Sequence, residues 1–351
     1  MVLLGLIRGL QLAATLSAFG ALLFRSAVAP AALARVDAGS ADKISDSLTL
    51  IVRASIVAAF VSAVTWLPLE AAAMSGAGSV AETAAAVPVV LLQTVFGHAL
   101  SLRLLLLGAA LLVLGSGRHV TRVAVAAGLA GIACILQAGM GHSAAAESLP
   151  LPAAVMVHVV AAGAWLGGLL PLWLMVRRLP HDAASVAARR FSPLGIAAVS
   201  VLAATAVLQG ADLIGGIPGL LDTAYGRLAL AKTMLFALLI GLAAANRRVF
   251  TPRLARSATA GQNLERSIVA ETGLGLLVVL AASSMAVLPP GSMQMAQGAS
   301  SAVASAMASD HAAGGRRTES PIRLVPRTLL AARQTAPAVA RYRAAGHMAC
   351  S

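Results

Sequence analysis

Long apolar stretches separated by shorter polar ones dominate this 351-residue chain. Each apolar stretch has roughly 18 residues or more, which is long enough to cross a hydrocarbon layer about 30 Å thick. Because backbone amides in lipid must be hydrogen-bonded within their own segment, these stretches are predicted to be helices. The eight predicted spans are residues 3–26, 50–74, 97–116, 121–141, 152–176, 193–213, 227–246 and 267–288. The predicted fold class is therefore all-α, a polytopic membrane protein.

Two parts of the chain repeat one another. Residues 91–118 align without gaps on residues 220–247, at an offset of 129 positions. Both contain Leu-Leu-x-Thr-x-aromatic-Gly before a span, and both carry a cation six residues after the glycine, Arg103 in one copy and Lys232 in the other. A repeat of spans in the same orientation implies a pseudo-twofold axis along the membrane normal. We therefore predict a parallel duplication of a four-helix unit.

The chain divides into a transmembrane part and a tail. The transmembrane domain is predicted to cover residues 1–288, with a first half at 1–141 and a second half at 152–288. Residues 289–351 are rich in Ala, Ser, Arg and Gly and show no strand pattern, so this low-complexity tail is expected to be disordered.

The first apolar stretch has an alternative interpretation. A basic residue, an apolar run and the small-residue sequence "AVAP" at 27–30 are also typical of a cleavable signal peptide. Pro30 would directly follow the cleavage point, however, and Arg25 interrupts the approach to it. We expect this stretch to remain in the protein as its first helix.

Composition and charge agree with a membrane protein. Hydrophobic residues make up 59% of the chain and charged residues 11%, against about 25% charged in an average soluble domain. The formal charge of +13 comes largely from alternate loops. Thirteen Lys and Arg residues lie in the loops 27–49, 117–122, 177–192 and 247–266, and none lie in the loops 75–96, 142–151 and 214–226. Basic loops mark the cytoplasmic side, so both termini are predicted to be periplasmic and no nucleic-acid partner is expected.

Four charged residues fall inside the predicted spans, near their outer ends. Glu70 and Asp212 end the second and sixth spans, and Arg103 and Lys232 lie in the third and seventh. Charges in a bilayer are costly and usually pair or mark a pathway, so the pairs Glu70–Arg103 and Asp212–Lys232 are predicted. The alternative is that both cations extend to the lipid headgroups.

Three histidines fall in the outer third of the predicted membrane domain. His98 begins the third span, His142 ends the fourth, and His158 lies about two turns into the fifth. Residues from three distant segments are how a ligand set is built in a helical bundle, and Met140 is a possible fourth ligand. Neutral imidazole and thioether groups suit copper, Cu(I) in particular. The alternative is that each histidine is simply a hydrogen-bonded residue at a helix end.

The second half contains a series of motifs in a characteristic order. These are "HVVAAGAWLGGLLPLWL" at 158–174, "RRFSPLGIAAVSVLAATAVLQG" at 189–210 and "TAYGRLALAKTMLFALLIGLAAANRRVFTPRL" at 223–254. Together they resemble the CopD copper-resistance family, and "TVFGHALSLRLLL" in the first half suits its longer members, so the resemblance covers about residues 1–288.

The resemblance implies a bacterial inner-membrane protein of copper transport and homeostasis. It also implies a CopC-like periplasmic copper-binding protein as partner, from which copper would be received and moved, most simply inward. A different class of protein remains open, because His158 and a second histidine could axially ligate a b-type haem in a membrane redox protein. The chain lacks a Walker loop and an HExxH motif, so neither an ATP-driven pump nor another enzyme is expected.

Overall fold

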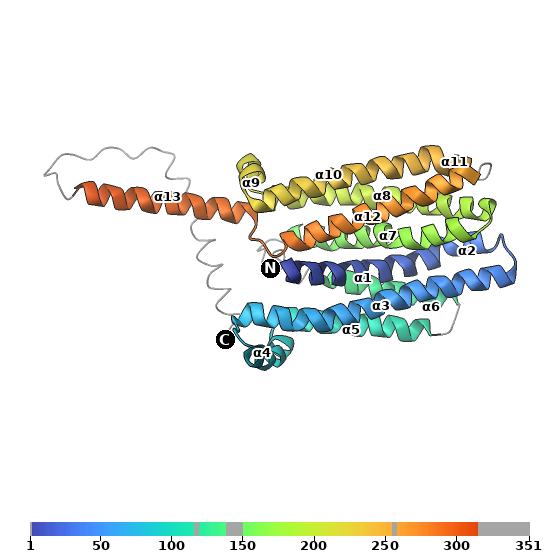
Figure 1. The fold of residues 1–351 in the computed structure, drawn as a ribbon, viewed down its shortest axis with the longest axis horizontal. Helices are drawn as coiled ribbons and strands as arrows, with labels where there is room; N and C mark the ends of the chain where they lie inside the picture. Colours follow the sequence, from blue (N-terminus) through green and yellow to red (C-terminus); the bar gives the residue numbers. More distant parts are fainter. Residues whose placement is uncertain (1, 116–118, 138–149, 255–257, 315–351) are drawn as a thin grey trace. The chain divides into compact units, whose positions relative to one another are not determined.

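The structure is a computed structural model that describes residues 2–115, 119–137, 150–254 and 258–314 (Figure 1). This part of the chain is helical and contains no strand, which confirms the all-α fold class. The elements are α1 Val2–Ala27, α2 Ala29–Leu33, α3 Ala38–Ser75, α4 Val80–Gln93, α5 Val95–Leu114, α6 Val120–Ile135, α7 Pro150–Arg178, α8 His181–Leu213, α9 Gly216–Asp222, α10 Ala224–Ala245, the π-helix η3 Asn246–Phe250, α11 Thr251–Arg253, α12 Ala258–Met285 and α13 Gly291–Gly314. One compact unit comprises Met1–Ala296, and a second comprises Gln297–Ser351.

Seven helices of the described chain are long and apolar enough to cross a membrane. They are Leu3–Ala27, Ala38–Ser75, Val95–Leu114, Leu151–Arg178, His181–Leu213, Ala224–Arg253 and Thr259–Met285. The predicted span 121–141 corresponds to α6, whose 16 residues are apolar but short of a full crossing. Residues 138–149 lie outside the described chain, so the eighth span stays a prediction.

Helices also occupy two segments for which the sequence indicated loops, residues 75–96 and 214–226. The short helices α4 and α9 lie at the same end of the bundle, each just before a long helix (Figure 1). Ser79 caps the start of α4, because its hydroxyl accepts a hydrogen bond from Glu82 N at 3.2 Å and satisfies one of the free amides of the first turn.

The segment after residue 288 also differs from the sequence-based expectation of disorder. Its first part forms the helix α13, Gly291–Gly314, while residues 315–351 lie outside the described chain. No proline interrupts residues 291–314, and Ala, Met and Gln are compatible with a helix.

The repeated sequence produces the same local structure twice. Thr94 caps α5 by accepting a hydrogen bond from Gly97 N at 3.1 Å, and Thr223 caps α10 by accepting one from Gly226 N at 2.9 Å. A Cβ atom on either glycine would lie 2.2 Å from a backbone carbonyl oxygen of the preceding short helix. Only glycine therefore fits at these two positions. The duplication of the whole four-helix unit stays a prediction, which this equivalence supports.

Helix α1 is the central helix of the first unit, and it packs against α3, α6, α7 and α12. Its contact with α7 is especially close: a Cβ on Gly20 would lie 2.2 Å from Gly163 O, and one on Gly167 would lie 2.1 Å from Leu16 O. Gly163 and Gly167 are four residues apart, the small-xxx-small spacing that lets membrane helices approach closely. This contact sets the position of α7, which carries His158.

Candidate metal site

His158 on α7 is hydrogen-bonded to Thr205 on α8. The imidazole is half-buried, Thr205 is buried, and the distance from His158 Nδ1 to Thr205 Oγ1 is 2.8 Å. Helices α7 and α8 pack against one another along their length, so the two residues meet although they are 47 positions apart in sequence. Thr205 is held in place by its own helix.

The hydrogen bonds of Thr205 favour the tautomer of His158 that carries its proton on Nδ1. A hydroxyl has one hydrogen to donate, and the Thr205 hydroxyl donates it to Val201 O at 2.7 Å. Thr205 Oγ1 therefore accepts a hydrogen bond from His158 Nδ1–H, and the lone pair of a neutral ring remains on Nε2. An imidazole whose other nitrogen donates to a fixed acceptor is the usual arrangement of a metal-binding histidine.

Lys232 on α10 is a cation that interacts with this imidazole. Its ammonium is close enough to His158 for an electrostatic interaction. The predicted partner of Lys232, Asp212, is exposed near the C-terminal end of α8, and the described chain shows no ion pair between these two residues. The structure thus gives Lys232 a histidine neighbour in place of the predicted carboxylate.

The first half has a matching arrangement of two linked helices and a buried cation. Ser62 Oγ on α3 donates to Gln11 Oε1 on α1 at 2.5 Å. This hydrogen bond links α1 and α3 in the way that the bond between His158 and Thr205 links α7 and α8. Arg103 on α5 is 0% exposed, and its Nη2 donates to Thr15 Oγ1 on α1 at 3.0 Å. Arg103 and Lys232 are equivalent in the sequence repeat, and each lies beside a polar link between helices, Arg103 fully buried and Lys232 half-buried.

Glu70 also has a different neighbour from the one expected. Its Oε2 accepts a hydrogen bond from Trp66 Nε1 at 2.8 Å, and the guanidinium of Arg8 lies over the Trp66 ring, 5.7 Å from the ring centroid. Electrostatic attraction joins Arg8 to Glu70. Within the described chain the cation that interacts with the Glu70 carboxylate is therefore Arg8 and not Arg103.

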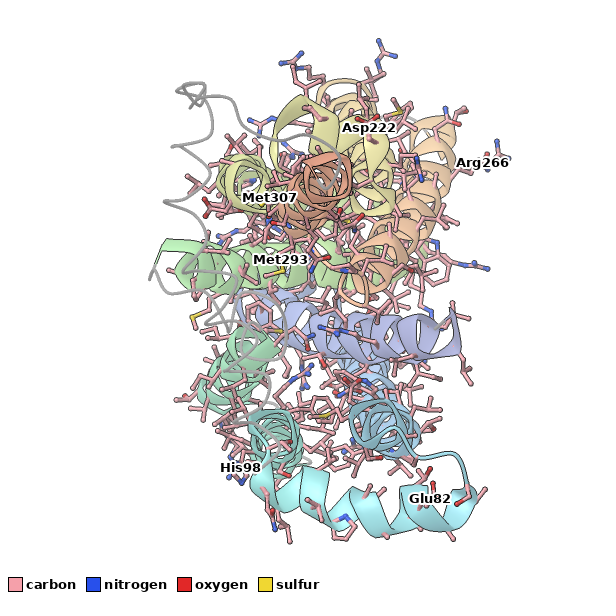
Figure 2. The ribbon with its side chains drawn as sticks, turned by 90° about the vertical axis from the view of Figure 1, so that its left-hand side faces the viewer. Glu82, His98, Asp222, Arg266, Met293 and Met307 are labelled. Atoms are coloured by element: carbon pink, nitrogen blue, oxygen red, sulfur yellow. The ribbon has the colours of Figure 1, made fainter. Side chains whose placement is uncertain are left out.

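The other predicted metal ligands are not brought together with His158 in the described residues. His98 is exposed near the start of α5, where its Nε2 lies 2.8 Å from Leu92 O, and Figure 2 shows it beside α4 at the edge of the first half. His142 and Met140 lie outside the described chain. Among the residues that are described, no three His, Cys, Asp or Glu side chains lie close enough to hold a metal ion. A shared site of all four residues stays a prediction.

A pocket lies between the helices that carry His158, Thr205 and Lys232. Its volume is about 460 Å³, and its lining runs from Trp165, seven residues along α7 from His158, to Asn246 and Glu271. Asn246 Nδ2 donates a hydrogen bond to Glu271 Oε1, and Glu271 is 2% exposed. Asn246 belongs to the π-helix η3, and π-helical turns frequently occur at functional sites.

The sequence pattern did not indicate several of these polar residues. Thr205, Gln11, Thr15 and Ser62 are uncharged and are easily taken as tolerated polar residues in apolar helices. One signal was available: Arg8, Gln11 and Thr15 follow at intervals of three and four, which places them on one face of α1. No comparable pattern on α8 indicates that Thr205 meets a histidine.

The fold and this site define a class, the polytopic α-helical membrane proteins with a half-buried, hydrogen-bonded histidine between two spans. Comparison with known families goes further. The model "copper resistance protein D" matches residues 185–285, and the model "copper resistance protein D-like, N-terminal domain" matches residues 1–150. The chain belongs to the copper resistance protein D family, as the motifs of the second half indicated.

Three curated relatives are similar over parts of the chain. The inner membrane protein YebZ of Escherichia coli (strain K12) is 40% identical over 127 residues, which are 34% of this chain and 43% of the relative. The copper resistance protein D of Pseudomonas syringae pv. tomato is 29% identical over 60% of this chain and 74% of its own length. The copper transport protein CutJ of Bacillus subtilis (strain 168) is 29% identical over 44% of this chain and 28% of its own length. The match thus spans less than half of the first relative's length. No solved structure matches the chain.

Proposed function

We propose that this copper-handling, multi-pass inner-membrane protein moves copper across the membrane, with import as the favoured direction. Family membership and the names of two relatives, a copper resistance protein and a copper transport protein, support copper as the substrate. The name of the Escherichia coli relative and the seven apolar helices support the inner membrane.

The observation that carries the proposal is the hydrogen bond between His158 and Thr205. It leaves the Nε2 lone pair of His158 without a hydrogen-bond partner in the described chain, in a half-buried position between helices. Neutral imidazole is a good ligand for copper, and we propose that Met140 and His142 supply further donors. A site with few ligands, beside the repelling ammonium of Lys232, binds an ion weakly enough to release it.

We propose that the pocket from Trp165 to Glu271 is the inner part of the route. Trp165 lies roughly 10 Å along the helix from His158, at a rise of 1.5 Å per residue. Carboxylate and amide oxygens at its far end, on Glu271 and Asn246, are hard ligands that hold Cu(I) poorly, and the neighbouring Arg247 and Arg248 repel a cation there. An ion that leaves His158 can therefore pass this region without being trapped.

On this proposal the protein is a transporter and not an enzyme. Its periplasmic partner is a CopC-like copper-binding protein that delivers the ion to the outer end of the bundle. Transport then follows the concentration gradient of copper or the gradient of another ion.

Cellular copper content tests the proposal. Expression of the protein should raise cell-associated copper, and His158→Ala should abolish the increase at unchanged membrane abundance. The matched control is His119→Ala, since His119 is an exposed histidine at the start of α6. Equal copper content with and without His158 would overturn the role of this residue, and no change on expression of the native protein would overturn copper transport.

The same geometry at His158 also fits the second candidate, an axial haem ligand, because that role equally needs a neutral imidazole with its lone pair on Nε2. An absorption spectrum of the purified protein separates the two functions. We expect no Soret band. A Soret band that disappears in His158→Ala would replace copper transport by a b-type haem redox function.

A further inference from the structure

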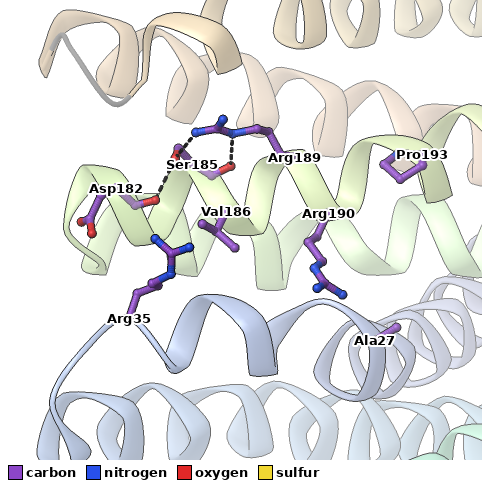
Figure 3. A pocket seen from close by; sticks show the side chains of 8 residues that line it. All are labelled: Ala27, Arg35, Asp182, Ser185, Val186, Arg189, Arg190 and Pro193. Carbon is purple, nitrogen blue, oxygen red and sulfur yellow. Dashed lines mark hydrogen bonds between the residues drawn. The ribbon is translucent and has the colours of Figure 1, made fainter.

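A basic pocket lies between the end of α1, the short helix α2 and the first turns of α8 (Figure 3). Its volume is about 760 Å³. Three arginines line it, Arg35, Arg189 and Arg190, together with the apolar side chains of Ala27, Val186 and Pro193. Asp182 is the one acidic residue of the lining. The pocket therefore combines a net positive charge with an apolar wall.

Two of the three guanidinium groups have no protein partner in the described residues. Arg189 is engaged, since its Nη2 donates to Ser185 Oγ at 2.8 Å and its Nε to Ser185 O at 3.3 Å. Arg35 and Arg190 are exposed, and within the described chain neither donates a hydrogen bond nor lies within 4 Å of a carboxylate. Figure 3 shows both in the space between α8 and the segment that follows α1. Each guanidinium thus offers five N–H donors to a ligand.

Helix lengths place this pocket at the boundary of the membrane. The apolar span of α1 ends at Ala27, which lines the pocket. Helix α8 has 33 residues, about 50 Å at 1.5 Å per residue, and exceeds a hydrocarbon layer of about 30 Å by some 20 Å. Arg189 and Arg190 lie in the first ten residues of α8, and no further charged residue follows before Asp212. The excess length is therefore at the arginine end, which places Arg190 in the headgroup layer.

We propose that this pocket binds the phosphate headgroup of an anionic phospholipid. Guanidinium groups pair with phosphate oxygens through two parallel hydrogen bonds, and Arg35 and Arg190 approach the pocket from different helical segments. The apolar wall of Ala27, Val186 and Pro193 contacts the glycerol and the start of the acyl chains. Inorganic phosphate shares the headgroup chemistry but gains nothing from that wall. Basic pockets between spans, at the side with the basic loops, are the usual site for anionic lipids.

The bound lipid would join two parts of the fold. Arg35 lies in the turn after α2, which itself directly follows α1, whereas Arg190 belongs to α8 of the second half. A lipid headgroup held by both arginines links these two segments across the pocket. The lipid therefore stabilises the protein itself, and this inference does not depend on copper as the substrate.

Thermal unfolding of the purified protein in a neutral detergent tests the proposal. Added phosphatidylglycerol should raise the Tm, phosphatidylcholine should not, and inorganic phosphate at the same phosphate concentration should have little effect. The double variant Arg35→Gln, Arg190→Gln should need at least about tenfold more phosphatidylglycerol for the same rise, since each variant removes a charge-assisted phosphate contact. The control, Arg122→Gln, changes an exposed arginine of α6 outside the pocket and should respond like the native protein.

Three results would overturn the proposal. One is an equal response of the native protein to both lipids, and another is an unchanged phosphatidylglycerol response in the double variant. The third is a full response to inorganic phosphate, which would assign the pocket to a soluble anion. Arg190→Gln alone, with an expected intermediate response, keeps the test valid if the double variant does not fold.

Discussion

His158 Nδ1 lies 2.8 Å from Thr205 Oγ1, and the Thr205 hydroxyl donates a hydrogen bond to Val201 O at 2.7 Å. This relationship connects two neighbouring spans and favours one tautomer of a histidine that lies half-buried between them. Loss of a group that orients a metal ligand typically costs about 10–100-fold in affinity or activity.

Thr205 is therefore predicted to be a positioning residue for copper uptake. Thr205→Val keeps the shape of the side chain but removes the acceptor, and it should lower copper accumulation about tenfold or more. Thr205→Ser restores the hydroxyl and should recover most of the activity. The measurement is copper accumulation at matched membrane abundance. Equal activity of the Val and Ser variants would show that Thr205 only packs.

The close contact between α1 and α7 should make Gly167 intolerant of any side chain. In Gly167→Ala the new Cβ would lie 2.1 Å from Leu16 O, so the two helices must separate. Overpacking of this kind costs about 1–3 kcal/mol and should lower the Tm measured in detergent.

Gly241→Ala is the matched control for that substitution. Gly241 lies in α10 with no atom within 4 Å of a new Cβ, so alanine should leave the stability unchanged or raise it by up to about 1 kcal/mol. A similar Tm for both variants would contradict the close approach of α1 and α7.

Asp212 and Lys232 are predicted to act independently, because the structure does not join them in an ion pair. Asp212 is exposed, so Asp212→Asn should change the free energy of unfolding by no more than about 0.5 kcal/mol. A double-mutant cycle with Lys232→Ala should show a coupling energy close to zero. Coupling of several kcal/mol would instead support the buried pair that the sequence indicated, since removing one partner of such a pair costs about 3–5 kcal/mol.

The orientation of the chain should place α4 outside and the start of α8 inside. A membrane-impermeant maleimide added to intact spheroplasts should label Ala81→Cys in α4 and leave His181→Cys unlabelled until the membrane is opened. Both positions are exposed, and Cys134 is buried and should not react. Cys350 is replaced by serine in both variants. Labelling of His181→Cys in intact spheroplasts would reverse the predicted topology.

The sequence alone determined the class of protein and most of its helices, because these depend on local properties. A run of about 20 apolar residues spans a bilayer whatever its neighbours are. The motif around Thr94 and Gly97 likewise forms its cap within a few residues, and the same motif does so again at Thr223. The helices α4 and α9 were missed because they are too short to span a membrane and each contains a proline, and α13 was missed because its small and polar residues are also typical of loops.

Only the tertiary structure decided which polar residues meet. Arg103 contacts Thr15 across 88 positions, and His158 contacts Thr205 across 47, where the sequence had favoured carboxylate partners for the cations and other histidines for His158. The reason is physical: in a membrane helix the lipid-facing side and the packed side are both apolar, so periodicity does not reveal which side faces a neighbour. That choice depends on how closely helices approach one another, as α1 and α7 do through Gly20 and Gly167.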